Sequence, residues 1–148
     1  MLARRELSEA QLRARFLRRQ FDEDEVDAAV ARLRREGALD DRRTALACAR
    51  TEAHVKRHGR LRALRQVEAI GIPRAVARAA VAEAFADLDE DALIAQALER
   101  RLRRGGGGAE PTPAALARLH RYLLAQGFDA GRVTAALRSR LKVAVHDD

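Results

Sequence analysis

Two histidines, His54 and His58, stand four residues apart in a stretch whose pattern predicts a helix. On a continuous helix this spacing turns both imidazoles the same way, as two metal ligands would face. The neighbouring residues do not complete a metal site, because there is no HExxH sequence, Lys56 and Arg57 would repel a cation, and Gly59 ends the predicted helix. We therefore expect no metal site and no other cofactor.

The other stretches that could carry chemistry have simpler interpretations. The glycines at 105–108 follow a predicted helix and lack a Gly-Lys-Ser/Thr ending, so they do not predict a phosphate loop. Acidic residues at 40–41 and 87–91 stand at predicted helix starts, where carboxylates complement the helix dipole. The single cysteine, Cys48, excludes an internal disulfide, and we expect it to be a buried structural thiol. No nucleophile–base pair can be proposed, so we expect that the protein is not an enzyme.

The composition predicts an all-α fold. Of the 148 residues 47% are hydrophobic but only 3% are aromatic, so alanine, leucine and valine supply most of the apolar surface. Glycine and proline gather in a few places that separate helical patterns. There is no run of 18 apolar residues and no signal-peptide pattern, so we expect a soluble, cytoplasmic protein with no membrane contact.

Capping patterns predict eight helices. Ser8 with Gln11 and Asp22 with Glu25 are typical of helix starts. The further predicted starts lie at Asp40 or Asp41, Gly59, Pro73, Asp89, Thr112 and Asp129. Residues 2–7 look like the end of an earlier helix, so we expect the first helix to be truncated. The segment 105–113 is predicted to be a flexible linker.

One type of turn occurs three times. An apolar residue at Phe21, Ile72 and Phe128 follows a helix end and precedes a second apolar helical stripe. The intervals of 51 and 56 residues predict tandem three-helix repeats at 1–38, 39–87 and 88–142, with a flexible tail at 143–148. The alternative is that capped pairs of alanine-rich helices match one another by chance.

Several of these segments resemble one known family. RRELSEAQL (4–12), REGALDD (35–41), GRLRALRQVEAIGI (59–72) and LLAQGFDAGRVTAALRSRL (123–141) are similar in order and spacing to the RecX family, bacterial modulators of the RecA recombinase. The resemblance implies an elongated, curved array of three-helix repeats. It also suggests that the early start at Met1 marks a truncated product or a misassigned start codon.

The positive charge is concentrated in the middle of the chain. The formal net charge is +7, and residues 42–78 hold ten basic residues against Glu52 and Glu68. Such a surface attracts phosphates or an acidic protein. The candidate contact residues for a partner or nucleic acid are Arg57, Arg60, Arg62, Arg65, Arg74 and Arg78. The alternative is a solvated helix face in an arginine-rich proteome.

The resemblance implies a monomeric regulator that binds RecA and the RecA–DNA filament. By occupying the filament groove it would hinder the recombinase, ATPase and coprotease activities of RecA, and so regulate DNA repair and the SOS response. Weak direct binding to single- or double-stranded DNA is expected from the same charge. Two alternatives stay open: a stand-alone helical module that binds nucleic acid without RecA, and a helical scaffold.

Overall fold

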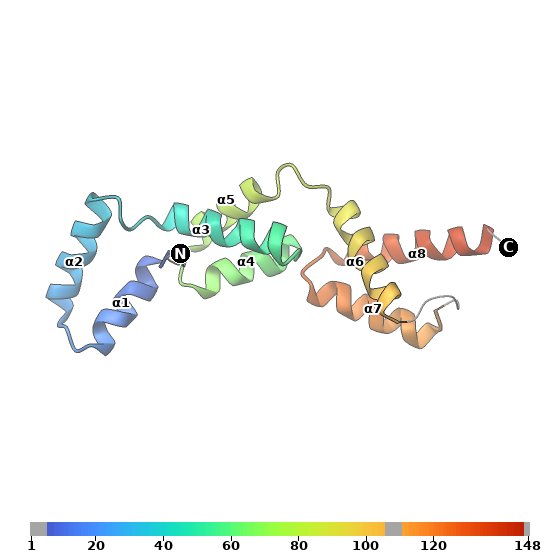
Figure 1. The fold of residues 1–148 in the computed structure, drawn as a ribbon, viewed down its shortest axis with the longest axis horizontal. Helices are drawn as coiled ribbons and strands as arrows, with labels where there is room; N and C mark the ends of the chain where they lie inside the picture. Colours follow the sequence, from blue (N-terminus) through green and yellow to red (C-terminus); the bar gives the residue numbers. More distant parts are fainter. Residues whose placement is uncertain (1–5, 106–110, 147–148) are drawn as a thin grey trace.

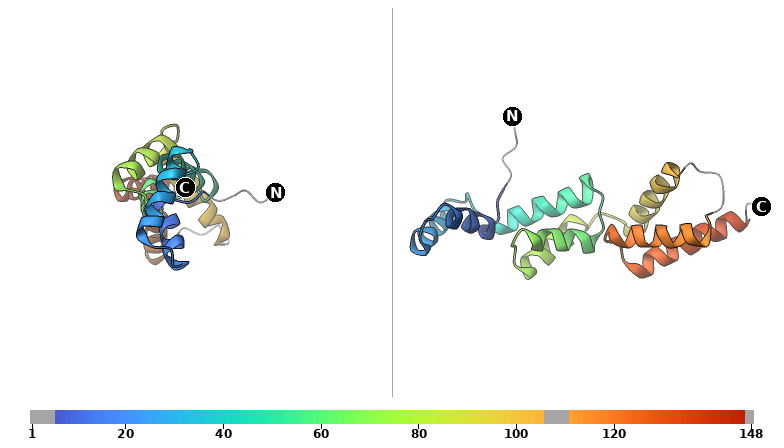
Figure 2. Two further views of the ribbon diagram at one scale, coloured as in Figure 1. Left: turned by 90° about the vertical axis from the view of Figure 1, so that its left-hand side faces the viewer. Right: turned by 90° about the horizontal axis from the view of Figure 1, so that it is seen from below.

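The computed structural model describes residues 6–105 and 111–146, and within these ranges it holds helices and no strand. The chain forms an elongated body with α1 and α2 at one end, α3 to α5 in the middle and α6 to α8 at the other end (Figure 1). Figure 2 shows the same body end-on and from below. The helices are α1 (Glu9–Arg18), α2 (Glu23–Arg35), α3 (Asp41–Arg50), the π-helix η1 (Thr51–Val55), α4 (Arg60–Ala69), α5 (Arg74–Ala84), α6 (Glu90–Arg104), α7 (Pro113–Ala125) and α8 (Ala130–His146).

Side chains cap most of the helices where the sequence predicts. The Ser8 hydroxyl accepts from the Gln11 backbone N–H, and the Gln11 side chain accepts from the Ser8 N–H in return. Asp22 caps α2, and Asp40, rather than Asp41, caps α3. Asp41 instead accepts a hydrogen bond from the Glu9 N–H at 2.9 Å and so links α3 to α1. The all-α prediction is confirmed for the described residues.

Buried apolar residues form three clusters that follow one another along the chain. The first lies on α2 and the following turn, with Val26, Val30 and Leu39 buried. The second holds α3, η1, α4 and α5 together around small residues such as Ala45, Ala63 and Ala77 and the ring of Phe85. The third joins α6, α7 and α8 around Ile94, Leu123, Phe128 and Val133. Close packing through alanine explains how so few aromatic residues suffice. The proposed repeat boundaries stay a prediction.

Successive clusters are joined by contacts of one kind, between the turn of one helix pair and the start of an earlier helix. The turn after α4 has Gly71 against Ala10 of α1, and the Ile70 carbonyl accepts from the Ser8 hydroxyl. The turn after α7 has Gly127 against the start of α4, where the Gly59 N–H donates to the Gln126 carbonyl at 2.7 Å. Both turns contain a glycine with positive φ, 88° at Gly71 and 96° at Gly127.

Several sequence-based expectations need correction. The third predicted helix does not run unbroken to Arg57, because α3 changes into η1 at Thr51. Leu61 does not point to the core: it is 53% exposed, since Ala63 and Val67, one turn apart, make the buried face of α4. Cys48 is half-buried and packs against the second cluster.

The ends and the linker differ in part from expectation. The predicted helix remnant at 2–7 lies mostly outside the described residues, and Glu6 and Leu7 are not helical. The helix α8 continues through 143–146, the first part of the expected tail. Residues 106–110 of the predicted linker also lie outside the described residues. No helix in the described ranges is long and apolar enough to cross a membrane.

Candidate functional site

The six arginines predicted as a contact surface fall into different structural settings. Two of them, Arg60 and Arg62, lie at the start of α4, where the second cluster meets the turn after α7. The guanidinium of Arg60 lies 5.6 Å from the centre of the Phe85 ring. Arg62 donates through Nη1 to the Ala125 carbonyl oxygen at 3.2 Å. These two side chains therefore also hold the fold together.

The next three arginines are exposed on α4 and α5. Arg74 lies 3.8 Å from a carboxylate oxygen of Glu68, a distance at which an exposed ion pair contributes little. Arg65 and Arg78 make no hydrogen bond or ion pair within the described part of the chain, so their charges are available to a partner.

The sixth, Arg57, lies in the short connection between η1 and α4. Its φ of 56° is in the left-handed region, which is uncommon for residues other than glycine. Hydrogen bonds on both sides fix this conformation: the Lys56 N–H donates to the Thr51 carbonyl at 3.0 Å, and the His58 N–H donates to the Glu52 carbonyl at 2.9 Å. A residue held in a sparsely populated conformation between such bonds is a candidate functional residue.

A buried carboxylate anchors the same connection. Glu52 of η1 is 2% exposed, and its two oxygens bind the Lys56 ammonium at 3.2 Å and Nδ1 of His58. His58 is thus tied to a carboxylate within the protein, while His54 is exposed on η1. The continuous helix that would align the two histidines is not present, and no group of three metal-ligating residues occurs in the described ranges.

Arg57 lines a cavity of about 190 Å³ at the junction of η1, α6 and α7. None of the other five predicted arginines lines it. The cavity gathers five basic side chains from two distant segments, Lys56, Arg57, Arg100, Arg101 and Arg104. No acidic residue is among its lining residues in the described part of the chain. We call this set the joint cavity.

The basic run at the end of α6 was visible in the sequence, but its proximity to Arg57 was not. Arg100, Arg101 and Arg104 were therefore absent from the predicted contact residues. In the structure the Arg101 guanidinium lies 4.6 Å from the centre of the Tyr122 ring of α7, which holds it at the cavity wall. The joint cavity is thus part of the candidate interface, and its chemistry is that of an anion receptor.

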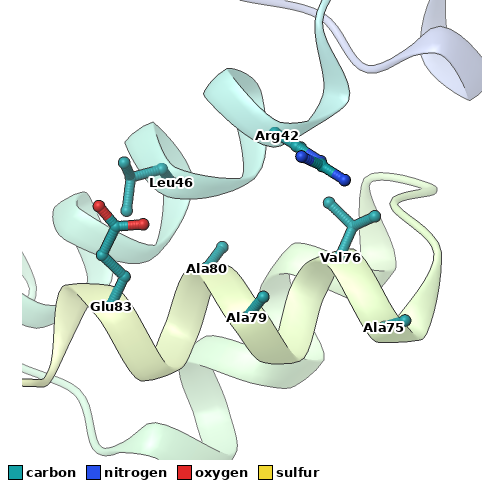
Figure 3. Close-up of a pocket in the computed structure, with 7 residues that line it drawn as sticks. All are labelled: Arg42, Leu46, Ala75, Val76, Ala79, Ala80 and Glu83. Carbon is teal, nitrogen blue, oxygen red and sulfur yellow. The ribbon is translucent and has the colours of Figure 1, made fainter.

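A second hollow, on the face formed by α3 and α5, has a different character. It is an open groove of about 430 Å³ with a floor of alanine and valine. Figure 3 shows Arg42 and Val76 toward one end and Leu46 and Glu83 toward the other. This groove can accept apolar side chains, and it contains no pair of groups that could act as nucleophile and base.

Comparisons with known proteins identify relatives of this chain. Residues 1–33 match the family model described as RecX, first three-helix domain. The Regulatory protein RecX of Treponema pallidum (strain Nichols) is 34% identical over 107 residues, 72% of this chain. The protein of the same name from Chlorobaculum tepidum is 30% identical over 103 residues, 70% of this chain.

The chain spans 65% of the length of the Treponema relative and 62% of the length of the Chlorobaculum relative. The matches agree with the resemblance drawn from the helix punctuation, and the chain belongs to the RecX family.

Proposed function

We propose that this protein is a non-enzymatic regulator that binds RecA and the RecA–DNA filament and lowers the recombinase, ATPase and coprotease activities of RecA. The observation that carries the proposal is the similarity to proteins named regulatory protein RecX over about 70% of the chain. RecA as the partner follows from what is known of that family. Through RecA the protein would regulate DNA repair and the SOS response in the cytoplasm.

The shape and charge of the molecule support a steric and electrostatic mode of action. An elongated helical body can lie along a filament groove and contact it over a long path (Figure 1). Residues 42–78 carry a strong excess of positive charge, which favours an acidic protein surface or a phosphate backbone. The proposed contact residues are Arg57, Arg60, Arg62, Arg65, Arg74 and Arg78.

Not all of these six are equally suited to a mutational test. Neutralising Arg60 or Arg62 would also remove the contacts with Phe85 and Ala125 described above. Arg65→Gln with Arg78→Gln changes two exposed charges that make no internal contact in the described ranges. The matched control is Arg15→Gln with Arg35→Gln, two exposed arginines on α1 and α2 at the other end of the body.

The test sets a gel shift on DNA alone beside the ATPase of RecA on single-stranded DNA. We expect ATPase inhibition by the wild type and the control, and weaker inhibition by Arg65→Gln/Arg78→Gln. Tight DNA binding without any effect on RecA would favour the alternative, a stand-alone nucleic-acid-binding module.

A further inference from the structure

We propose that the joint cavity is a phosphate-binding site, which takes one phosphate of a nucleic-acid backbone or of a free polyphosphate. The inference deepens the proposed function by giving part of the interface a ligand chemistry. It rests on the proposed function only for the expectation that DNA, as in a RecA filament, supplies the phosphate.

The first argument is electrostatic. Five cationic side chains line a space of about 190 Å³, and no carboxylate from the described residues faces them there. Cations held this close repel one another, so the arrangement costs stability until an anion enters. Guanidinium groups donate in a planar fork that matches phosphate oxygens, and three of the five come from a single helix end.

The second argument is that the site is held in shape before any ligand arrives. Lys56 is bonded to the buried carboxylate of Glu52, and Arg101 lies over the ring of Tyr122. The backbone of Arg57 is held at positive φ, and directly after it the Gly59 N–H donates to the Gln126 carbonyl. Side chains that are already ordered lose less conformational entropy on binding.

A purely structural explanation covers only part of this arrangement. Arg101 and Arg104 lie in the last turn of α6, where cations are favourable because of the helix dipole. That effect does not account for Lys56 and Arg57, which approach from the end of η1, some 45 residues earlier in the chain by their numbering. Nor does a helix end require a strained backbone at Arg57.

The experiment uses the full chain with Arg100→Gln/Arg104→Gln, two exposed positions outside the apolar clusters. The control is again Arg15→Gln/Arg35→Gln, which removes the same charge at the far end. Binding of labelled oligothymidylate is followed by fluorescence anisotropy over a range of salt. We expect the cavity variant to bind roughly tenfold more weakly or worse, with a salt slope smaller by about 1.4, and the control to stay near wild type.

A second arm measures thermal stability with added pyrophosphate, because a ligand that binds the folded state raises the melting temperature. A rise in wild type and control that is lost in the cavity variant supports the site. If pyrophosphate stabilisation falls but DNA affinity does not, the phosphate source is a free polyphosphate.

The proposal is overturned if both probes act on the cavity variant as on the control. It is also overturned if the variant loses only binding to poly-glutamate, since the site would then serve an acidic peptide. Neither arm contains RecA, so a protein that binds phosphate here but leaves the RecA ATPase unchanged refutes the proposed function and not the site.

Discussion

Gly59 and Gly127 meet backbone to backbone where the second apolar cluster joins the third. A Cβ placed on Gly59 would overlap the carbonyl oxygen of Gly127 and lie 2.5 Å from its carbonyl carbon. In the other direction, a Cβ on Gly127 would lie 2.9 Å from the Cα of Arg62. The Leu61 N–H donates to the Gly127 carbonyl at 3.1 Å, so the contact also satisfies donors at the start of α4.

This contact predicts a graded series of glycine substitutions. Gly127→Ala should lower the free energy of unfolding by about 2–4 kcal/mol, because positive φ and overlap with α4 both oppose the new methyl group. The matched control is Gly37→Ala, which has a φ of 75° but no atom within 4 Å of the new Cβ. It should cost only about 1–2 kcal/mol. Equal losses in urea unfolding would show that the joint is not tightly packed.

The two phenylalanines of the repeated turn should differ in their contribution to stability. Phe128 is 1% exposed in the third cluster, whereas Phe21 is 44% exposed and contacts Phe16 edge to face at 5.7 Å. Phe128→Ala should cost about 3–5 kcal/mol, and Phe21→Ala clearly less, about 1 kcal/mol. Chemical denaturation of both variants measures this. Similar losses would mean that the ring of Phe21 is buried in solution.

Glu52 should be important for the connection that carries Arg57. Replacing it with glutamine keeps the shape of the side chain but removes the charge that binds Lys56 and His58. We expect a loss of about 1–3 kcal/mol in unfolding free energy, together with faster amide exchange at 56–58. Glu36→Gln, which breaks the exposed ion pair with Arg32, is the control and should cost under about 1 kcal/mol. The same exchange rates in both variants would contradict the anchoring role.

The first helix pair should lose stability in acid through Glu9. Arg34 donates a hydrogen bond to Glu9 at 2.5 Å, and this contact, aided by Arg13, lowers the pKa of the Glu9 carboxyl below its ordinary value. A carboxylate with a depressed pKa stabilises the fold at pH above its ordinary pKa, and this contribution is lost as the pH falls through the folded-state value. Glu9→Gln should therefore flatten the acid side of the stability curve in thermal melts.

The matched control for this prediction is Glu23→Gln, on the exposed side of α2 with no ion pair in the described ranges. Its stability should fall in acid as steeply as that of the wild type. A Glu9→Gln curve with the same steepness would remove Glu9 from the account.

Local signals in the sequence were sufficient for most of the fold. Ser8, Asp22, Asp89 and Thr112 cap helices as predicted, because a cap depends on residues only two or three positions away. The change from α3 to η1 had no comparable signal. It depends on long-range bonds at the joint, where Gly59 meets a turn almost 70 residues later in the chain by their numbering.

The candidate site was only partly predictable for the same reason. Counting charges locates the basic middle of the chain but cannot tell which arginines are free. Arg62 is taken up by the Ala125 carbonyl, while Arg57 is brought beside the end of α6 by tertiary packing. Segments that meet through packing leave no periodic pattern in the sequence.

The most direct test of the central claim is the ATPase of RecA on single-stranded DNA, measured as the purified protein is titrated in. As a RecX-family regulator it should lower the rate in a dose-dependent way, and more effectively than Arg65→Gln/Arg78→Gln. A rate that stays constant at saturating protein, under conditions in which the protein is folded, would contradict the claim.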